Sequence, residues 1–201
     1  MSCTQKFPNH LINLIKTSKY VHLATCSKDC VPSVSLMNYT YVPADKSYNH
    51  KEGQTDDYII FATCANTEKY ENILANPAVS LLFHDWITAN NLSVRKNSLS
   101  QSATPDPTTL PTSTKGSHPS KLLNLLQELN QAELNEMSAT LKGRAELIAP
   151  STEESAYYKK LLLRTNPDAD VFILGDNTYV VKVKIVSAKV TDSENNTTIY
   201  N

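Results

Sequence analysis

The sequence predicts a mainly antiparallel β-barrel with helices packed on its outside. Several short segments rich in β-branched and aromatic residues alternate apolar with polar side chains, which is typical of half-buried strands. A few helical segments separate them without the regular strand–helix–strand repeat of a parallel sheet. The chain has 201 residues, of which 40% are hydrophobic, and this size favours one domain over two. We therefore expect a single domain over residues 1–201.

The chain opens with an expected helix and an expected strand. Pro8 can occupy the first turn of a helix, which then places on one face the apolar residues Leu11, Leu14 and Ile15. Residues 20–25 are rich in β-forming residues, and polar turn residues follow them. We therefore expect the first strand over 20–25.

A longer strand is expected over residues 33–42, after Pro32. Its two faces differ in polarity and consist of Val34, Leu36 and Val42 on one side and Ser33, Ser35 and Met37 on the other. This alternation is expected when one face of a strand is core and the other is a site or a surface.

The next elements are a strand, a helix and another strand. Residues 58–63 are β-rich, and Asn66 or Thr67 can then cap a helix. The apolar face of this helix consists of Tyr70, Ile73 and Leu74. The helix should end before Pro77, because the residue before a proline is disfavoured in helical conformation. Residues 79–83 are almost continuously apolar and form the fourth expected strand.

Residues 88–120 differ in composition from the rest of the chain. They are rich in Ser, Thr, Asn and Pro and show almost no apolar periodicity, which predicts a mobile insertion. Leucines at helical spacing follow over 122–129 and predict a helix used for packing.

The last part of the chain is expected to contain two strands around a helix. Residues 137–148 form the fifth strand, and Ser151 with Glu154 has the spacing of a capping box that begins a helix. That helix should stop before Pro167, and the alternating segment 179–190 is the sixth strand.

Charge and cysteine patterns exclude several functional classes. Lys and Arg number 19 against 20 Asp and Glu, with no basic block to follow a phosphate backbone, so nucleic acid is not expected as a partner. The four cysteines form no C-x-x-C pair and no histidine cluster completes a ligand set, so no metal is expected. No apolar run has the length of a signal peptide or a membrane span. We therefore expect a cytoplasmic protein without a membrane partner, for which entry into the nucleus stays open.

The first candidate site runs from Thr63 into the helix that follows it. Unpaired amides and the positive end of the helix dipole gather at a helix start. Such a place suits a phosphate, to which Thr63 and Thr67 can add hydroxyl donors and Lys69 a positive charge. A solvated Lys69 neutralised by Glu68 is the alternative on these residues alone.

Two further segments have residue types suited to a bound ring. Small hydroxyl residues alternate with apolar ones in Ser33, Val34, Ser35 and Leu36, so a flat aromatic ring can lie against this strand. The alternative is a solvent-facing strand. In the second segment Gly143 permits close approach and Arg144 can offset negative charge, or Arg144 is simply an exposed strand residue.

The order of these segments resembles the pyridoxamine 5'-phosphate-oxidase-like flavin proteins with the FMN-binding split-barrel fold. The matching stretches lie at residues 32–39, 60–69, 76–82 and 142–146. The resemblance implies a six-stranded antiparallel split barrel that works as a homodimer, with FMN held at the interface of two barrels. It places the phosphate near Lys69 and Thr67, the ribityl chain near Thr63 and the ring along Ser33 to Leu36.

The sequence also departs from this family in two places. Glu68 stands where related flavin oxidases often carry an arginine on the phosphate. Residues 191–201 lack the Arg- and His-containing tail with which true pyridoxamine-phosphate oxidases hold their substrate. We therefore expect an FMN-binding protein without authentic pyridoxamine-phosphate oxidase activity. The alternatives are an FMN-dependent oxidoreductase acting on another small substrate and a haem-handling relative, for which His22 and His84 are the candidate ligands.

Overall fold

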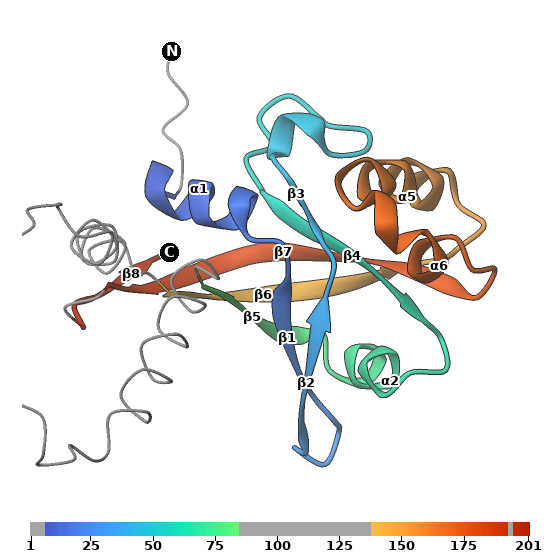
Figure 1. The fold of residues 1–201 in the computed structure, drawn as a ribbon, viewed down its shortest axis with the longest axis horizontal. Helices are drawn as coiled ribbons and strands as arrows, with labels where there is room; N and C mark the ends of the chain where they lie inside the picture. The colour runs from blue at the N-terminus through green and yellow to red at the C-terminus, as the bar shows by residue number, and fades with distance from the viewer. Residues whose placement is uncertain (1–6, 85–137, 193–194) are drawn as a thin grey trace, which may run out of the picture.

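The fold is one curved antiparallel sheet with helices at its ends and edges (Figure 1). The computed structural model describes residues 7–84, 138–192 and 195–201. Seven strands follow the order β2-β1-β5-β6-β7-β4-β3, and β8 pairs with β7 beside this path. The strands are β1 (Val21–Cys26), β2 (Pro32–Met37), β3 (Thr40–Val42), β4 (Tyr58–Cys64), β5 (Ala78–His84), β6 (Ser138–Ile148), β7 (Thr178–Thr191) and β8 (Thr197–Tyr200). The mainly antiparallel barrel with flanking helices is confirmed, and the described residues form eight strands where six were expected.

One of the additional strands arises because the segment 33–42 divides in two. β2 pairs with β1, whereas β3 pairs with β4 on the far side of the sheet order, so the chain crosses from one end of the sheet to the other. At the break Tyr39 is buried, and its phenol O–H faces the carbonyl oxygens of Ile15 and, at 2.8 Å, Ser18. These contacts turn Tyr39 toward the first helix and interrupt the strand. The other additional strand, β8, lies in the C-terminal residues.

A β-bulge bends the two longest strands. The register between β6 and β7 shifts between Lys142 and Gly143. A Cβ atom on Gly143 would lie 2.4 Å from Val183 Cγ1 and 2.8 Å from the Lys184 carbonyl oxygen. Gly143 therefore does permit a close approach, and the approaching group is the neighbouring strand β7.

Four α-helices cover the sheet in the described part of the chain. They are α1 (Asn9–Thr17), α2 (Glu68–Ala75), α5 (Glu153–Thr165) and α6 (Asp170–Ile173), with short 3-10 turns η1 (Ala44–Lys46) and η2 (Pro167–Ala169). The main core joins α1 and α2 to the inner face of the sheet. A second core lies under α5 and α6, against Tyr58, Ile60 and Val180. Burial on both faces explains why β4 is nearly continuous in apolar residues.

Three predictions about side chains and caps are wrong in detail. Val34 and Leu36 are 66% and 53% exposed, whereas Val42 is buried because it packs in the second core with residues of α5 and α6. Leu74 is 68% exposed, since α2 buries only Asn72 and Ile73. The helix α5 is capped by Thr152, whose hydroxyl accepts a hydrogen bond from the Ser155 amide at 3.1 Å. The capping box expected from Ser151 and Glu154 therefore does not form.

Two predictions concern residues outside the described part of the chain. These are the mobile insertion at 88–120 and the packing helix at 122–129. Within residues 7–84, 138–192 and 195–201, no helix is both long and apolar enough to span a membrane.

Candidate functional site

The end of β4 and the start of α2 bring three of the predicted site residues together. Thr63 is 4% exposed, and its Oγ1 lies 2.9 Å from Thr67 Oγ1. Thr67 is the N-cap of α2, but its hydroxyl donates to the Cys64 carbonyl at 2.8 Å and makes no capping bond. Its side chain therefore leaves the first-turn amides of α2 to other acceptors. Lys69 lies in that first turn and is half-buried.

The inner face of β2 adjoins this helix. Ser33 pairs with Thr25 of β1, and Thr25 accepts a hydrogen bond of 3.1 Å from Asn72 of α2. Cross-strand partners point to the same side of a sheet, so Ser33 lies on the side that α2 covers. Ser35 has the same orientation, and both serines are half-buried. One chain thus places Ser33, Ser35, Thr63, Thr67 and Lys69 on one side of the sheet.

Val34 and Leu36 lie on the opposite face of β2. Leu36, His22 and Leu82 form a row across β2, β1 and β5, and Val34 pairs with Ala24 in the next row. Leu82 is 39% exposed, and with Val34 and Leu36 it forms an apolar patch that we call the outer β2 face. His22 stacks on His84 beside it, with ring centroids 5.4 Å apart.

Arg144 is also separated from the α2 side of the sheet. Its neighbour Ala145 is in the main core, so the Arg144 side chain is on the other face, where it is exposed. Its cross-strand partner Lys184 forms an ion pair with Asp56 at 2.6 Å on that face. The structure therefore does not bring Arg144 together with Lys69 of the same chain.

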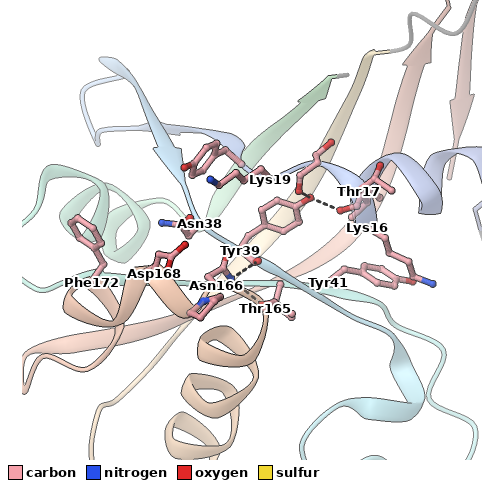
Figure 2. A pocket seen from close by; sticks show the side chains of 16 residues that line it. Lys16, Thr17, Lys19, Asn38, Tyr39, Tyr41, Thr165, Asn166, Asp168 and Phe172 are labelled. Atoms are coloured by element: carbon pink, nitrogen blue, oxygen red, sulfur yellow. Dashed lines mark hydrogen bonds between the residues drawn. The ribbon is translucent and has the colours of Figure 1, made fainter. Parts of the chain in front are cut away.

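A cavity of about 490 Å³ lies where β2 ends (Figure 2). Its walls are formed by three connecting segments that are distant in the sequence. They join α1 to β1, β2 to β3, and α5 to α6. Figure 2 shows Lys19, Asn38, Asp168 and Phe172 on one side of Tyr39, with Lys16 and Tyr41 on the other. The cavity thus combines aromatic rings with two ammonium groups, a carboxylate and two amides.

The cavity walls are held in place by hydrogen bonds between these links. Asn166 donates from Nδ2 to the Tyr39 carbonyl at 3.0 Å, and the hydroxyls of Thr40 and Thr165 contact each other. Burial raises the pKa of Tyr39 well above its usual range, so this phenol stays protonated as a donor to the carbonyl oxygens of Ile15 and Ser18. Lys16 stacks on Tyr41, with Nζ 5.6 Å from the ring centroid. The arrangement is preformed by contacts within the chain.

Sequence reasoning did not find this cavity. None of the predicted residues Ser33, Val34, Ser35, Leu36, Thr63, Thr67, Lys69 and Arg144 lines it. The sequence signals for this cavity are two asparagines that follow regular elements, Asn38 after β2 and Asn166 after α5. Taken one segment at a time, the sequence predicts only a strand residue at Asn38 and a helix end at Asn166.

The curved antiparallel sheet, with its bulge and its peripheral helices, is a split β-barrel, and this fold was also expected from the resemblance. The chain belongs to the pyridoxamine 5'-phosphate oxidase family, whose sequence model matches residues 7–174.

Relatives and solved structures agree with this assignment. A pyridoxamine 5'-phosphate oxidase homolog of Saccharomyces cerevisiae is 58% identical over 98% of this chain and 96% of its own length. A second homolog from the same yeast is 46% identical over 100% of this chain and 97% of its own length. A heme binding protein from Mycobacterium smegmatis shares the fold with a TM-score of 0.57 and 14% identity, over 97% of this chain and 59% of that one.

Proposed function

We propose that the chain binds FMN between the two subunits of a homodimer and lacks authentic pyridoxamine-phosphate oxidase activity. The observation that carries this proposal is the junction of β4 and α2, where the Thr63–Thr67 hydroxyl pair meets the start of a helix that contains Lys69. Membership of the pyridoxamine 5'-phosphate oxidase family supports a flavin as the ligand.

The FMN phosphate is assigned to this junction on electrostatic grounds. The helix dipole and the first-turn amides favour an anion at the start of α2. The carboxylates of Glu68 and Glu71 also lie in the first turn and repel a dianionic phosphate. Lys69 is the cation of this turn that can offset that repulsion. Lys69 is half-buried whereas Glu68 is exposed, so Lys69 lies closer to the body of the protein than the neighbouring glutamate.

The flavin ring is assigned to the inner face of β2. Ser33 and Ser35 supply hydroxyl groups on the side that α2 covers, and both residues are half-buried. We assign the ribityl hydroxyls to Thr63, whose Oγ1 lies 2.9 Å from Thr67 Oγ1 at the proposed phosphate site. When bound, FMN supplies hydride and electron transfer, while these residues bind and orient it.

A second copy of the chain is the proposed partner. Val34, Leu36 and Leu82 are exposed on the outer β2 face, and contiguous exposed apolar side chains of this kind are typical of interaction surfaces. Arg144 lies on the sheet face opposite the α2 side, so we assign it to the FMN site of the partner subunit. A symmetric dimer then has two equivalent sites.

The absence of authentic oxidase activity is proposed from the C-terminal residues. The strand β8 pairs with β7 through Ala188 to Thr191, at the end of the sheet away from α5 and α6 (Figure 1). It contains no arginine or histidine that could hold a substrate phosphate beside the ring. An assay of pyridoxamine phosphate oxidation with added FMN should give no turnover, and turnover at about 1 per second, as in working enzymes, would contradict the proposal.

The alternative, an FMN-dependent oxidoreductase acting on another small substrate, is favoured by the cavity. β2 leads from the proposed ring site directly to Asn38, which lines the cavity of about 490 Å³. Pockets of this volume bind small molecules. The third reading is haem binding through His22 or His84, and a visible spectrum of the protein purified without added cofactor separates haem from flavin.

Lys69→Ala tests the proposed site directly. A charge-assisted hydrogen bond contributes about 1.5–3 kcal/mol, so the substitution should weaken FMN binding about 10- to 150-fold. Riboflavin lacks the phosphate and should bind the parent and the variant almost equally. Lys160→Ala removes an exposed lysine on α5 and serves as the matched control, with no change expected for either flavin. Unchanged FMN affinity in Lys69→Ala would overturn the phosphate assignment.

A further inference from the structure

Two charged side chains of opposite sign line the cavity at the end of β2. Lys19 lies between α1 and β1, and Asp168 lies in η2, between α5 and α6. Within the described part of the chain, neither side chain forms an ion pair with the other or with a third residue. Figure 2 shows both on the same side of Tyr39. A small ligand that carries a negative and a positive group can therefore meet both.

Asn38 adds an uncharged polar group on the same side of Tyr39 (Figure 2). The other asparagine of the cavity, Asn166, is engaged by the fold, because its Nδ2 donates to the carbonyl oxygens of Tyr39 and Leu162, each at 3.0 Å. Asn38 is half-buried, and its side chain makes no hydrogen bond to the described residues. Its amide is therefore available to donate to a ligand.

An aromatic ring borders these polar groups. Phe172 of α6 lines the cavity and is 67% exposed, and Figure 2 shows it on the side where Lys19 and Asp168 lie. An apolar group that packs on this ring removes apolar surface from water, which favours binding. Lys19 Nζ lies 5.3 Å from the ring centroid of Tyr20, another lining residue, and this contact holds the ammonium at the cavity wall.

The distribution of charge favours a carboxylate over a phosphate as the negative group of the ligand. The second ammonium of the cavity, on Lys16, lies on the other side of Tyr39 and stacks on Tyr41. The two ammonium groups therefore do not converge on one point, as they would around a tightly bound dianion. In addition, α1 ends at Thr17, and the negative end of its dipole repels a dianion more than a monoanion.

We propose that this cavity binds an α-amino acid with an apolar side chain. Lys19 and Asn38 donate hydrogen bonds to its carboxylate, Asp168 accepts from its ammonium group, and Phe172 packs on its side chain. The site is separate from the proposed FMN site, because none of the residues assigned to FMN lines the cavity. An amino acid can therefore bind whether or not FMN does.

Titration of the full chain with L-phenylalanine, followed by NMR, tests this assignment. We expect saturable binding at a single site per chain, with a Kd of about 1 mM or less. 3-Phenylpropionate lacks the ammonium group and phenethylamine lacks the carboxylate, so each loses a charged contact and should bind about 10-fold more weakly. Absence of saturable phenylalanine binding, or an analogue that binds as tightly as phenylalanine, would overturn the proposal.

Two variants separate the roles of the charged residues. Asp168→Asn should weaken phenylalanine binding about 10-fold and leave the affinity for 3-phenylpropionate unchanged, because that analogue has no group for Asp168 to bind. Lys19→Gln should weaken phenylalanine binding to the same extent and leave the affinity for phenethylamine unchanged. Equal losses for all three ligands, in a variant that unfolds at the same temperature as the parent, would contradict these roles.

Matched controls change a charge outside the cavity. Asp170→Asn alters a carboxylate that does not line the cavity and that accepts a hydrogen bond from the Val171 amide at 2.8 Å. Lys160→Gln removes an exposed ammonium on α5. Both variants should bind phenylalanine like the parent, and a 10-fold loss in either would contradict the assignment. Phenylalanine and FMN are titrated separately, so failure of the amino-acid site and failure of the FMN site give different results.

Discussion

Replacement of Gly143 by alanine should destabilise the fold through a clash that the sheet cannot avoid. The added Cβ would lie 2.4 Å from Val183 Cγ1 and 2.8 Å from the carbonyl oxygen of Lys184. Val183 is fully buried in the main core, and the carbonyl belongs to the backbone of β7. Neither atom can be displaced by a side-chain rotation at the surface, so the two longest strands must separate at the bulge.

The cost follows from what overpacking does in well-packed interiors. Extra methyl groups that force backbone shifts cost about 1–3 kcal/mol, and contact with a backbone atom places Gly143→Ala at about 2–3 kcal/mol. For a chain of this size each kcal/mol lowers Tm by about 2–4 °C, so a decrease of about 4–12 °C is expected.

The measurement is thermal unfolding followed by circular dichroism, with denaturant unfolding as a second assay. Lys142→Ala is the control, because Lys142 is the adjacent residue of β6 and its side chain is exposed. It should change the free energy of unfolding by no more than about 0.5 kcal/mol. A Gly143→Ala protein that unfolds within about 1 °C of the parent would refute the steric argument, since even the mildest overpacking predicts a larger decrease.

Two further substitutions test the packing of α2 and the outer β2 face. Asn72→Ala should lower the free energy of unfolding by about 1–3 kcal/mol, because the buried Thr25 hydroxyl loses its donor, and urea unfolding measures this loss. Leu36→Asp should convert the proposed dimer into monomers in sedimentation experiments, because a charge would have to be buried at the interface. Ile199→Asp alters an exposed residue of β8 and should leave the sedimentation coefficient unchanged; monomeric parent protein would contradict the dimer.

The strands with the strongest alternation or the most continuous apolar run were predicted well. The expected segments 58–63 and 79–83 correspond to β4 (Tyr58–Cys64) and β5 (Ala78–His84). Both strands lie inside the sheet with neighbours on each side, so local pattern and tertiary burial agree there. The first helix was predicted for the same reason, since Leu11, Leu14 and Ile15 are all buried.

The break at Tyr39 could not be predicted from local pattern. The alternation of apolar and polar residues continues through it, and the interruption depends on contacts of Tyr39 with the carbonyl oxygens of Ile15 and Ser18, which are distant in the sequence. The exposure of Val34 and Leu36 is not a local property either, because Val42 of the same expected strand is buried by packing in the second core with residues of α5 and α6. An edge segment of this kind pairs on one side only, and the hydrophobic pattern does not determine which face meets solvent.

The candidate site was accessible to sequence reasoning only where it is contiguous in the chain. Thr63, Thr67 and Lys69 follow one another across a strand end and a helix start, and the structure places them together. The cavity is built from three separate links, so no single segment of sequence carries a signal for it. Local motifs reveal sites formed by one turn, whereas the sites formed by topology require the fold.

Because of the orientation of β2, the proposed FMN site and the proposed dimer interface use opposite faces of the same strand. Ser33 and Ser35 lie on the α2 side of the sheet, whereas Val34 and Leu36 lie on the outer face together with exposed Leu82. One strand cannot present both sets of side chains to the same ring. If Val34 and Leu36 touch the flavin of their own chain, they do so through backbone groups, and their side chains are free to bind the second subunit. A monomer that binds FMN tightly would therefore contradict the assignment of Arg144 to the partner's FMN site. It would not test the assignment of Lys69 to the phosphate, which depends on the affinities of Lys69→Ala for FMN and riboflavin.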